Sequence, residues 1–193
     1  MMNIAVFASG NGSNFQAIYD ATQRGDLQAN ITIVVCDKPG ASVIERAEKV
    51  GIPTLVCSPK EFASKAAYEQ EIVKELATKK VEFIILAGYM RIIGEVLLKQ
   101  YPNRIVNIHP SLLPAFPGKD AVGQALKAGV KVTGVTVHYV DAGMDTGPII
   151  DQVIVPIGEA DTREQVEHHI HFVEHRFYPE VLQRVLTKQT LKA

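Results

Sequence analysis

The chain has 193 residues, of which 47% are hydrophobic and 21% are charged, which is enough apolar mass for one compact domain spanning residues 1–193. Its formal net charge is −1, from 20 basic and 21 acidic residues, so no overall field favours nucleic acid or an anionic membrane surface. No apolar run approaches membrane-spanning length, so we expect no membrane partner. An anionic ligand would have to be held by local groups.

The start of the chain and its cysteines indicate a cellular compartment. The first apolar run begins directly after the initial methionines, without a basic leader or a small-residue cleavage site, and predicts a strand rather than a signal peptide. Cys36 and Cys57 are not spaced like metal ligands, and a disulfide scaffold is not needed at this size. Both cysteines are typical of reduced, buried thiols in a cytoplasmic protein.

In the first half of the chain, short apolar runs alternate with helical periodicities. The runs predict buried strands over Asn3–Ala8, Ile31–Cys36, Phe83–Ala87 and Ile105–Ile108. The periodic stretches predict helices near Phe15–Arg24, Ser42–Val50, Lys65–Lys79 and Gly94–Tyr101. Strands separated by helices imply an α/β fold with a mostly parallel sheet covered on both faces.

The second half of the chain changes character after a proline-rich loop at Pro110–Gly118. A short helix near Ala121–Ala128 is expected to precede strands over Val132–Tyr139 and Ile149–Pro156. A long final helix is predicted by the apolar residues Val166, Ile170, Val173 and Phe177. Pro179 should end or kink that helix. Ligands should collect where the pattern switches.

A glycine-rich loop, Gly10-Asn11-Gly12-Ser13-Asn14, lies between the first strand and the first helix. Free backbone N–H groups and the positive end of a helix dipole converge there, which suits a phosphate. A plain tight turn with a helix cap is the alternative interpretation. A dinucleotide loop is disfavoured, although Asp37 could mimic its ribose-binding acid, because Phe15 stands at the third glycine position.

Asn107 and His109 lie two residues apart at the end of an apolar strand, so their side chains point to the same face of the sheet. Pro110 then stops the strand from continuing normally. An amide donor beside an imidazole suits acyl transfer, because the amide can donate to a developing oxyanion while the imidazole moves protons. Structural roles for both side chains remain the alternative.

Asp145 lies in the turn Asp141–Pro148, whose glycines and aspartates are typical of irregular loops. Considered by itself, Asp145 is interpreted as a turn residue. If the fold brings this turn against the strand of Asn107, a carboxylate near His109 would favour the imidazolium and raise the pKa of that histidine.

Histidines cluster on the final helix, where His171-Phe172-Val173-Glu174-His175 matches the H-x-x-E-H pattern of inverted zinc peptidases. A catalytic zinc also needs a third protein ligand and a water site, and the pattern supplies only two ligands. We therefore favour a solvated helix face and expect no metal, although His171 and Glu174 could still face a substrate.

Four segments in chain order together resemble the phosphoribosylglycinamide formyltransferase family. They are Ala8–Asn14, Ala87–Ile92, the Asn-Ile-His-Pro-Ser-Leu-Leu-Pro segment at Asn107–Pro114, and Asp141–Pro148. The third segment is specific to folate-dependent formyltransferases, while the glycine loop and short length are similar to the glycinamide branch. The resemblance implies a Rossmann-like parallel sheet flanked by helices, the formyltransferase fold.

The resemblance also implies substrates and contacts. The formyl donor would be 10-formyltetrahydrofolate and the acceptor 5-phosphoribosylglycinamide, in purine biosynthesis. Gly12, Ser13 and Asn14 would hold the substrate phosphate, and His171 and Glu174 would reach its ribose or glycinamide part. Folate contacts would come from Lys65, Met90, Arg91, Ile92, Ile93, Asn107, Asp141, Ala142, Gly143, Met144 and Asp145.

In that family the histidine matching His109 donates the proton, the aspartate matching Asp145 raises its pKa, and the asparagine matching Asn107 binds the formyl oxygen. Formyltetrahydrofolate deformylase and methionyl-tRNA formyltransferase are competing members of the superfamily, but both typically carry extra sequence. A non-catalytic module that binds a phosphate ligand is the competing class. The sequence leaves monomer and homodimer open.

Overall fold

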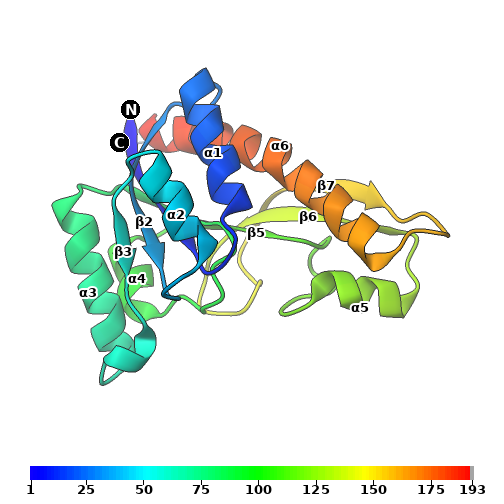
Figure 1. Cartoon of the computed structure of the whole chain (residues 1–193), viewed down its shortest axis with the longest axis horizontal. Helices are drawn as coiled ribbons and strands as arrows, with labels where there is room; N and C mark the ends of the chain where they lie inside the picture. The colour runs from blue at the N-terminus through cyan, green and yellow to red at the C-terminus, as the bar shows by residue number, and fades with distance from the viewer. Residues whose placement is uncertain (192–193) are drawn as a thin grey trace.

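The computed structural model describes residues 1–191 as one seven-stranded sheet, with strand order β3-β2-β1-β4-β5-β6-β7 and helices on both faces (Figure 1). The strands are β1 (Met2–Ala8), β2 (Ala29–Cys36), β3 (Thr54–Val56), β4 (Phe83–Leu86), β5 (Ile105–His109), β6 (Val132–Tyr139) and β7 (Ile149–Pro156). The helices are α1 (Ser13–Arg24), α2 (Ser42–Lys49), α3 (Lys65–Thr78), α4 (Glu95–Gln100), α5 (Ala121–Ala128) and α6 (Arg163–Thr190), with a 3₁₀ turn at Pro59–Glu61.

Strand order reverses beside β1, which creates the crevice that holds the site. The chain runs outward from β1 through β2 to β3, then crosses back to place β4 on the other side of β1, with these pairings all parallel. β5 continues the parallel part, and β6 and β7 add an antiparallel extension. In such sheets, ligands bind outside the carboxyl ends of the strands where the order reverses.

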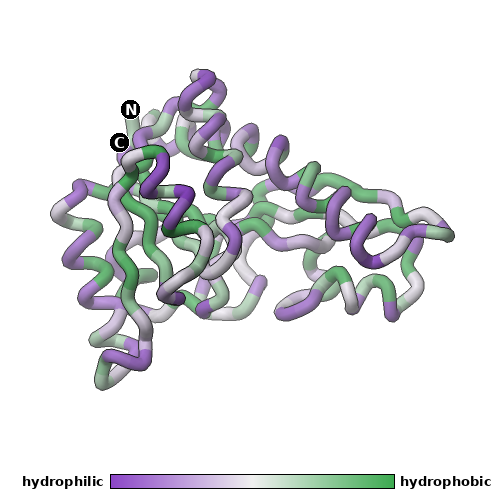
Figure 2. Tube along the Cα trace, in the orientation of Figure 1, coloured by the Kyte–Doolittle hydropathy of each residue, from purple (hydrophilic) through white to green (hydrophobic). Residues whose placement is uncertain are grey.

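Alternation along the strands divides the core into two layers. In β1, Ile4, Val6 and Ala8 pack with α1, α2 and α6, whereas Ala5 and Phe7 pack with α3 and α4 on the opposite face. Figure 2 shows hydrophobic residues concentrated along the strands and hydrophilic ones on the outer sides of the helices. Both faces of the parallel strands are therefore buried, as the continuous apolar runs predict.

The predicted α/β fold with a mostly parallel sheet is confirmed, and each predicted strand and helix is present with boundaries that shift by a few residues. Two features differ from the sequence predictions. β3 was not predicted, because three residues are too short to show a periodicity. Pro179 does not end the final helix, which continues to Thr190.

Packing explains why α6 continues through Pro179. A proline in a helix leaves the carbonyl four residues earlier without its usual donor, here that of His175. Around Pro179, however, the helix buries Tyr178, Val181, Leu182, Val185 and Leu186 against the sheet. The hydroxyl of Tyr178 also donates to the carbonyl of Leu86 at 2.8 Å. This burial outweighs the loss of one hydrogen bond.

None of the helices within residues 1–191 combines the length and apolar character required to cross a membrane.

Candidate active site

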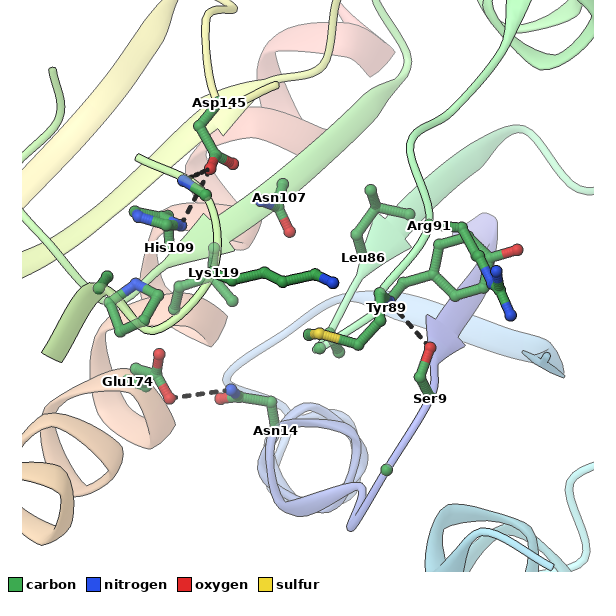
Figure 3. A pocket seen from close by; sticks show the side chains of 18 of the residues that line it. Ser9, Asn14, Leu86, Tyr89, Arg91, Asn107, His109, Lys119, Asp145 and Glu174 are labelled. Atoms are coloured by element: carbon green, nitrogen blue, oxygen red, sulfur yellow. Dashed lines mark hydrogen bonds and ion pairs between the residues drawn. The ribbon is translucent and has the colours of Figure 1, made fainter. Parts of the chain in front are cut away.

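A cavity of about 760 Å³ opens at the carboxyl ends of β1, β4 and β5. The glycine-rich loop after β1 and the segment after β4 form one wall, and β5 with the following loop forms another (Figure 3). Part of α6 and the loop between β6 and β7 complete it. The site therefore lies at the crevice where the strand order reverses.

Asn107 and His109 both line this cavity from the end of β5. Their neighbours Val106 and Ile108 belong to the core under α6, so the alternation of the strand turns Asn107 and His109 to the other face. On the adjacent antiparallel strand, His138 pairs with Asn107 and Thr136 pairs with His109. The two predicted catalytic side chains thus share one wall of the cavity.

Hydrogen-bond acceptors flank both nitrogens of the His109 ring. Nε2 donates to the carbonyl of Phe116 at 2.9 Å, and Nδ1 lies 3.4 Å from Oδ2 of Asp145. A carbonyl and a carboxylate can only accept, so an imidazolium with a proton on each nitrogen satisfies both contacts. Protein acceptors therefore orient both nitrogens of the His109 ring.

Asp145 connects this ring to the neighbouring loop. Burial acts to raise the pKa of Asp145, but His138, the backbone N–H of Gly118 and the charge of His109 together hold that pKa below its usual value. The Gly118 N–H donates to Oδ2 at 2.7 Å. Asp145 is therefore a carboxylate near neutral pH and can stabilise a positive charge on either histidine.

His138 was not predicted from the sequence, and it contacts the amide of Asn107. Its Nδ1 donates to the carbonyl of Tyr139 at 2.8 Å, which leaves Nε2 facing the Nδ2 atom of Asn107 at 3.2 Å and Oδ1 of Asp145 at 3.7 Å. A neutral His138 accepts one N–H of Asn107 at Nε2, so the second N–H of that amide stays available to the cavity. Only a protonated ring can instead donate from Nε2 to Asp145. His138 thus orients Asn107.

The loop after β5 is held by a buried network. The Thr136 hydroxyl donates to the Ser111 carbonyl at 2.7 Å and accepts the N–H of Leu113 at 3.1 Å. Gln152, from β7, donates to the Leu113 carbonyl at 2.8 Å. Since the Phe116 carbonyl that contacts His109 belongs to this loop, the network fixes the ring as well.

The glycine-rich loop ends at the first turn of α1 and faces the cavity. Gly12 caps the helix with φ of 78°, and a Cβ added there would lie 2.6 Å from Cγ2 of Val43. Only glycine fits this conformation and this close approach. The first backbone N–H groups of α1, at Ser13 and Asn14, are left free for an anion.

Across the cavity, α6 faces the glycine-rich loop and the first turn of α1. The amide of Asn14 donates to Oε2 of Glu174 at 3.1 Å, joining α1 to α6 (Figure 3). Burial raises the pKa of Glu174, while the Asn14 hydrogen bond and the charge of His171 oppose that rise. His171 and Glu174 both line the cavity. The residues predicted to bind the substrate phosphate and those predicted to contact its ribose or glycinamide part therefore line the same cavity.

The predicted folate residues are distributed unevenly. Met90, Arg91, Ile92, Ile93, Gly143 and Met144 line the cavity together with Asn107 and Asp145. Lys65, Asp141 and Ala142 do not line it. Lys65 instead lies beside the end of this segment, where its Cε would be 2.8 Å from a Cβ added to Gly94. Lys119, which was not predicted, extends across the cavity (Figure 3).

The three residues of the histidine pattern on α6 do not converge on one point. Glu174 is buried and bonded to Asn14, while the rings of His171 and His175 are 6.3 Å apart. Among residues 1–191, no three His, Cys, Asp or Glu side chains are grouped to hold a metal ion.

Comparison with known protein families assigns the chain to a family. A family model described as formyl transferase matches residues 2–182. The chain belongs to the formyl transferase family. Its sequence is also 57% identical, over 96% of its length and 95% of the relative, to the phosphoribosylglycinamide formyltransferase of Bacillus subtilis.

Solved structures give the same result for this formyl transferase. Glycinamide ribonucleotide transformylase 1 from Geobacillus kaustophilus is similar with a TM-score of 0.94 and 60% identity, covering 96% of this chain and 99% of that one. Phosphoribosylglycinamide formyltransferase from Bacillus halodurans also has a TM-score of 0.94, at 52% identity, covering 97% and 96%. The resemblance identified from the four sequence segments is confirmed, as is the fold that it implies.

Two of the residues that the sequence predictions missed, His138 and Ser9, take their place in the site through tertiary pairing. His138 sits opposite Asn107 only because of the β5–β6 register. Ser9 donates to Asp37 at 2.5 Å across neighbouring strands. The one available signal was a histidine within the strand predicted at Val132–Tyr139, because a buried polar side chain needs a hydrogen-bond partner.

Proposed function

We propose that this formyl transferase moves the formyl group of 10-formyltetrahydrofolate onto the amine of 5-phosphoribosylglycinamide, with residues 1–193 acting as one domain. The observation that carries this proposal is that Asn107 and His109 line the same wall of the cavity, with Oδ2 of Asp145 3.4 Å from Nδ1 of His109. An anion cradle at Gly12–Asn14 opens into the same cavity. The amine and the phosphate of one substrate can therefore be bound together.

The reaction needs no covalent intermediate with the protein. The neutral amine attacks the formyl carbon, the carbonyl oxygen gains negative charge, and the bond from carbon to the folate nitrogen then breaks. One N–H of Asn107 donates to the oxygen, which stabilises the tetrahedral intermediate. His109 acts as general acid: its Nε2–H leaves the Phe116 carbonyl and protonates the folate nitrogen as the bond from carbon to that nitrogen breaks. The attacking nitrogen then gives up one proton to His109, so the products are the N-formyl amide and tetrahydrofolate, and the histidine is protonated again.

Asp145 and His138 support these two groups. The Asp145 carboxylate stabilises the protonated form of His109, because it lies beside Nδ1 and stays ionised. His138 accepts from the Asn107 amide and so directs its remaining N–H. Loss of an oxyanion donor costs about 10²- to 10³-fold in rate, which is the scale expected for Asn107.

The folate is proposed to lie against the segment after β4. Met90 and Ile92 are 62% and 52% exposed at the cavity, which is unusual for large apolar side chains and suits a flat heterocycle. Met144 contributes a further exposed apolar side chain from the opposite loop. His171 and Glu174 are proposed to contact the ribose or glycinamide part.

A transfer assay in buffer containing a metal chelator tests the proposal. Tetrahydrofolate should form from 10-formyltetrahydrofolate rapidly with 5-phosphoribosylglycinamide present and at most slowly with water alone. Formation at the same rate without the amine would instead favour a deformylase. Asn107→Ala and His109→Ala should each abolish most turnover, while the matched control His169→Ala, an exposed histidine on α6 outside the cavity, should retain it.

The competing function, a non-catalytic module that binds a phosphate ligand, is tested by calorimetry alongside the transfer assay. Calorimetric binding of 5-phosphoribosylglycinamide without any formyl transfer would favour that module and contradict the proposal.

A further inference from the structure

Asp37 is a buried carboxylate that the formyl-transfer mechanism does not use. It follows β2, its side chain is 0% exposed, and it does not line the cavity. Ser9 donates to its Oδ1 at 2.5 Å, and Nε of Arg91 donates to its Oδ2 at 2.7 Å. A charge this deeply buried is retained only where hydrogen bonds and an opposite charge satisfy it.

Ser9 transmits the position of Asp37 to the backbone after β4. The hydroxyl that donates to Asp37 also accepts the N–H of Met90 at 2.8 Å, and the Ser9 N–H donates to the Gly88 carbonyl at 3.0 Å. The carboxylate fixes the direction of the hydroxyl hydrogen, so the oxygen lone pair must face Met90. Asp37 therefore sets the backbone of Met90 without touching it.

Arg91 gives a second attachment to the same segment. Its side chain is 44% exposed, so an unpaired Arg91 would sample many rotamers over the cavity mouth. The ion pair with Asp37 holds the guanidinium to one side, and the neighbouring side chains Met90 and Ile92 then remain turned outward at the cavity. Figure 3 shows Ser9, Tyr89 and Arg91 grouped at this wall.

The far end of the segment is held independently. Glu69 of α3 is buried and accepts the N–H of Gly94 at 2.5 Å and that of Leu97 at 3.3 Å, which caps the first turn of α4. Two buried carboxylates thus anchor residues 89–94 at opposite ends. Loss of the Asp37 anchor should loosen the Met90 end while α4 stays in place.

We propose that Asp37 is a positioning residue for folate binding: through Ser9 and Arg91 it holds the Met90–Ile93 segment in the conformation that contacts the folate. This inference rests on the proposed use of that segment. Asp37 acts on folate affinity, and it has no part in the chemistry at Asn107 and His109. The folate affinity should fall when the tether is cut, while kcat and the KM for the amine substrate should change little.

Asp37→Asn cuts one half of the tether with little change of shape. The amide oxygen can still accept from Ser9, but the amide nitrogen then faces Nε of Arg91, where two donors oppose each other. The matched control is Asp151→Asn, which breaks another aspartate–arginine pair, with Arg184, outside the cavity. Calorimetry with tetrahydrofolate alone should show a Kd raised about tenfold in Asp37→Asn, the effect of one charged hydrogen bond, and unchanged in Asp151→Asn.

A double-mutant cycle separates positioning from direct contact. If Arg91 acts through Asp37, Arg91→Gln should raise the Kd to a similar extent, and the double variant should resemble either single variant. Additive effects in the double variant would overturn the proposal. If Asp37→Asn does not fold, Ser9→Ala carries the test, because it removes the link from Asp37 to the Met90 N–H and leaves Arg91 paired with Asp37. Its tetrahydrofolate Kd should rise, with faster hydrogen exchange of the Met90 amide, and an unchanged Kd would overturn the proposal.

The outcomes distinguish this inference from the proposed function. Formyl transfer by the unaltered chain, together with an unchanged tetrahydrofolate Kd in Asp37→Asn, would overturn the inference and leave the function standing. No transfer, together with weaker tetrahydrofolate binding in Asp37→Asn, would support the inference and overturn the function. Failure of the unaltered chain to bind tetrahydrofolate would overturn both.

Discussion

The amide of Asn107 and the ring of His138 face each other across strands β5 and β6, with 3.2 Å between Nδ2 and Nε2. The same ring nitrogen lies 3.7 Å from Asp145, whose other oxygen lies 3.4 Å from His109. Asn107, His138, Asp145 and His109 therefore form one connected group. A change at His138 should therefore reach the reacting atoms through Asn107 and Asp145.

The first prediction concerns His138→Phe. The phenyl ring keeps an aromatic side chain at this position but cannot accept from Asn107, so the amide loses its fixed direction. We expect kcat to fall by about tenfold or more, within the range for a misdirected oxyanion donor, with KM values nearly unchanged. Steady-state kinetics of His138→Phe, Asn107→Ala and the double variant should show strongly non-additive losses. Additive losses would mean that His138 acts separately from Asn107.

The second prediction concerns the acid stability that Asp145 supplies. The pKa of Asp145 is below its ordinary value of 3.8 in the folded chain. A carboxyl group with a lowered folded pKa stabilises the fold above its unfolded pKa, and that contribution is lost as pH falls through the folded value. Asp145→Asn should therefore be less stable than the unaltered chain near neutral pH, with the difference shrinking below the ordinary pKa.

Urea denaturation at a series of pH values checks the Asp145 prediction. Asparagine tolerates the φ of 58° at position 145, so the substitution adds no backbone strain. Asp26→Asn, at an exposed ion pair with Arg24, is the control and should show almost no such pH dependence. A stability difference for Asp145→Asn that stays constant down to strongly acid pH would contradict the assignment.

Site residues that lie close together in the sequence could be predicted, whereas contacts between distant segments of the chain could not. The two-residue spacing of Asn107 and His109 fixes their common face through strand geometry alone. His138 meets Asn107 only through an antiparallel register, and hydrophobic alternation does not specify register. Asp37 and Arg91 are likewise 54 residues apart in the chain, after β2 and after β4, and no periodicity predicts that they pair.

The same distinction holds for the fold. The longer strands and helices were predicted, because burial of both strand faces gives continuous apolar runs and burial of one helix face gives a periodic pattern. Three-residue β3 shows no periodicity, and it is placed by its pairing with β2. Of the two outcomes predicted for Pro179, an end or a kink of the helix, the end does not occur. The penalty for proline in a helix is local, whereas the burial that offsets it comes from the sheet beneath α6.

The third prediction concerns the glycine-rich loop. Gly12→Ala forces a side chain into φ of +78° and places Cβ 2.6 Å from Cγ2 of Val43. We expect a loss of about 1–3 kcal/mol in the free energy of unfolding, measured with urea, because the backbone strain and the contact must both be relieved. Gly10→Ala is the matched control, since a Cβ at Gly10 meets nothing within 4 Å. Equal losses in the two variants would refute this explanation.

The fourth prediction concerns Glu174, where stability and binding oppose each other. Burial raises the pKa of Glu174 above its ordinary value of 4.5. An acid with a raised folded pKa favours the fold in its neutral form, so stability falls as pH rises from the unfolded pKa through the folded one. Glu174→Gln keeps an acceptor for the Asn14 amide and carries no charge. The stability of this variant should therefore not decrease over that pH range.

Thermal unfolding of the ligand-free protein at about pH 4 and about pH 8 measures this effect, since the window begins near the unfolded pKa of glutamate. Glu174→Gln should gain stability relative to the unaltered chain at the higher pH, while the exposed Glu180→Gln on the same helix should not. In the transfer assay, Glu174→Gln should raise the KM for 5-phosphoribosylglycinamide, because an amide accepts substrate hydrogen bonds more weakly than a carboxylate. A variant that is less stable at high pH and binds the substrate normally would show that Glu174 serves the fold alone, through its bond to Asn14.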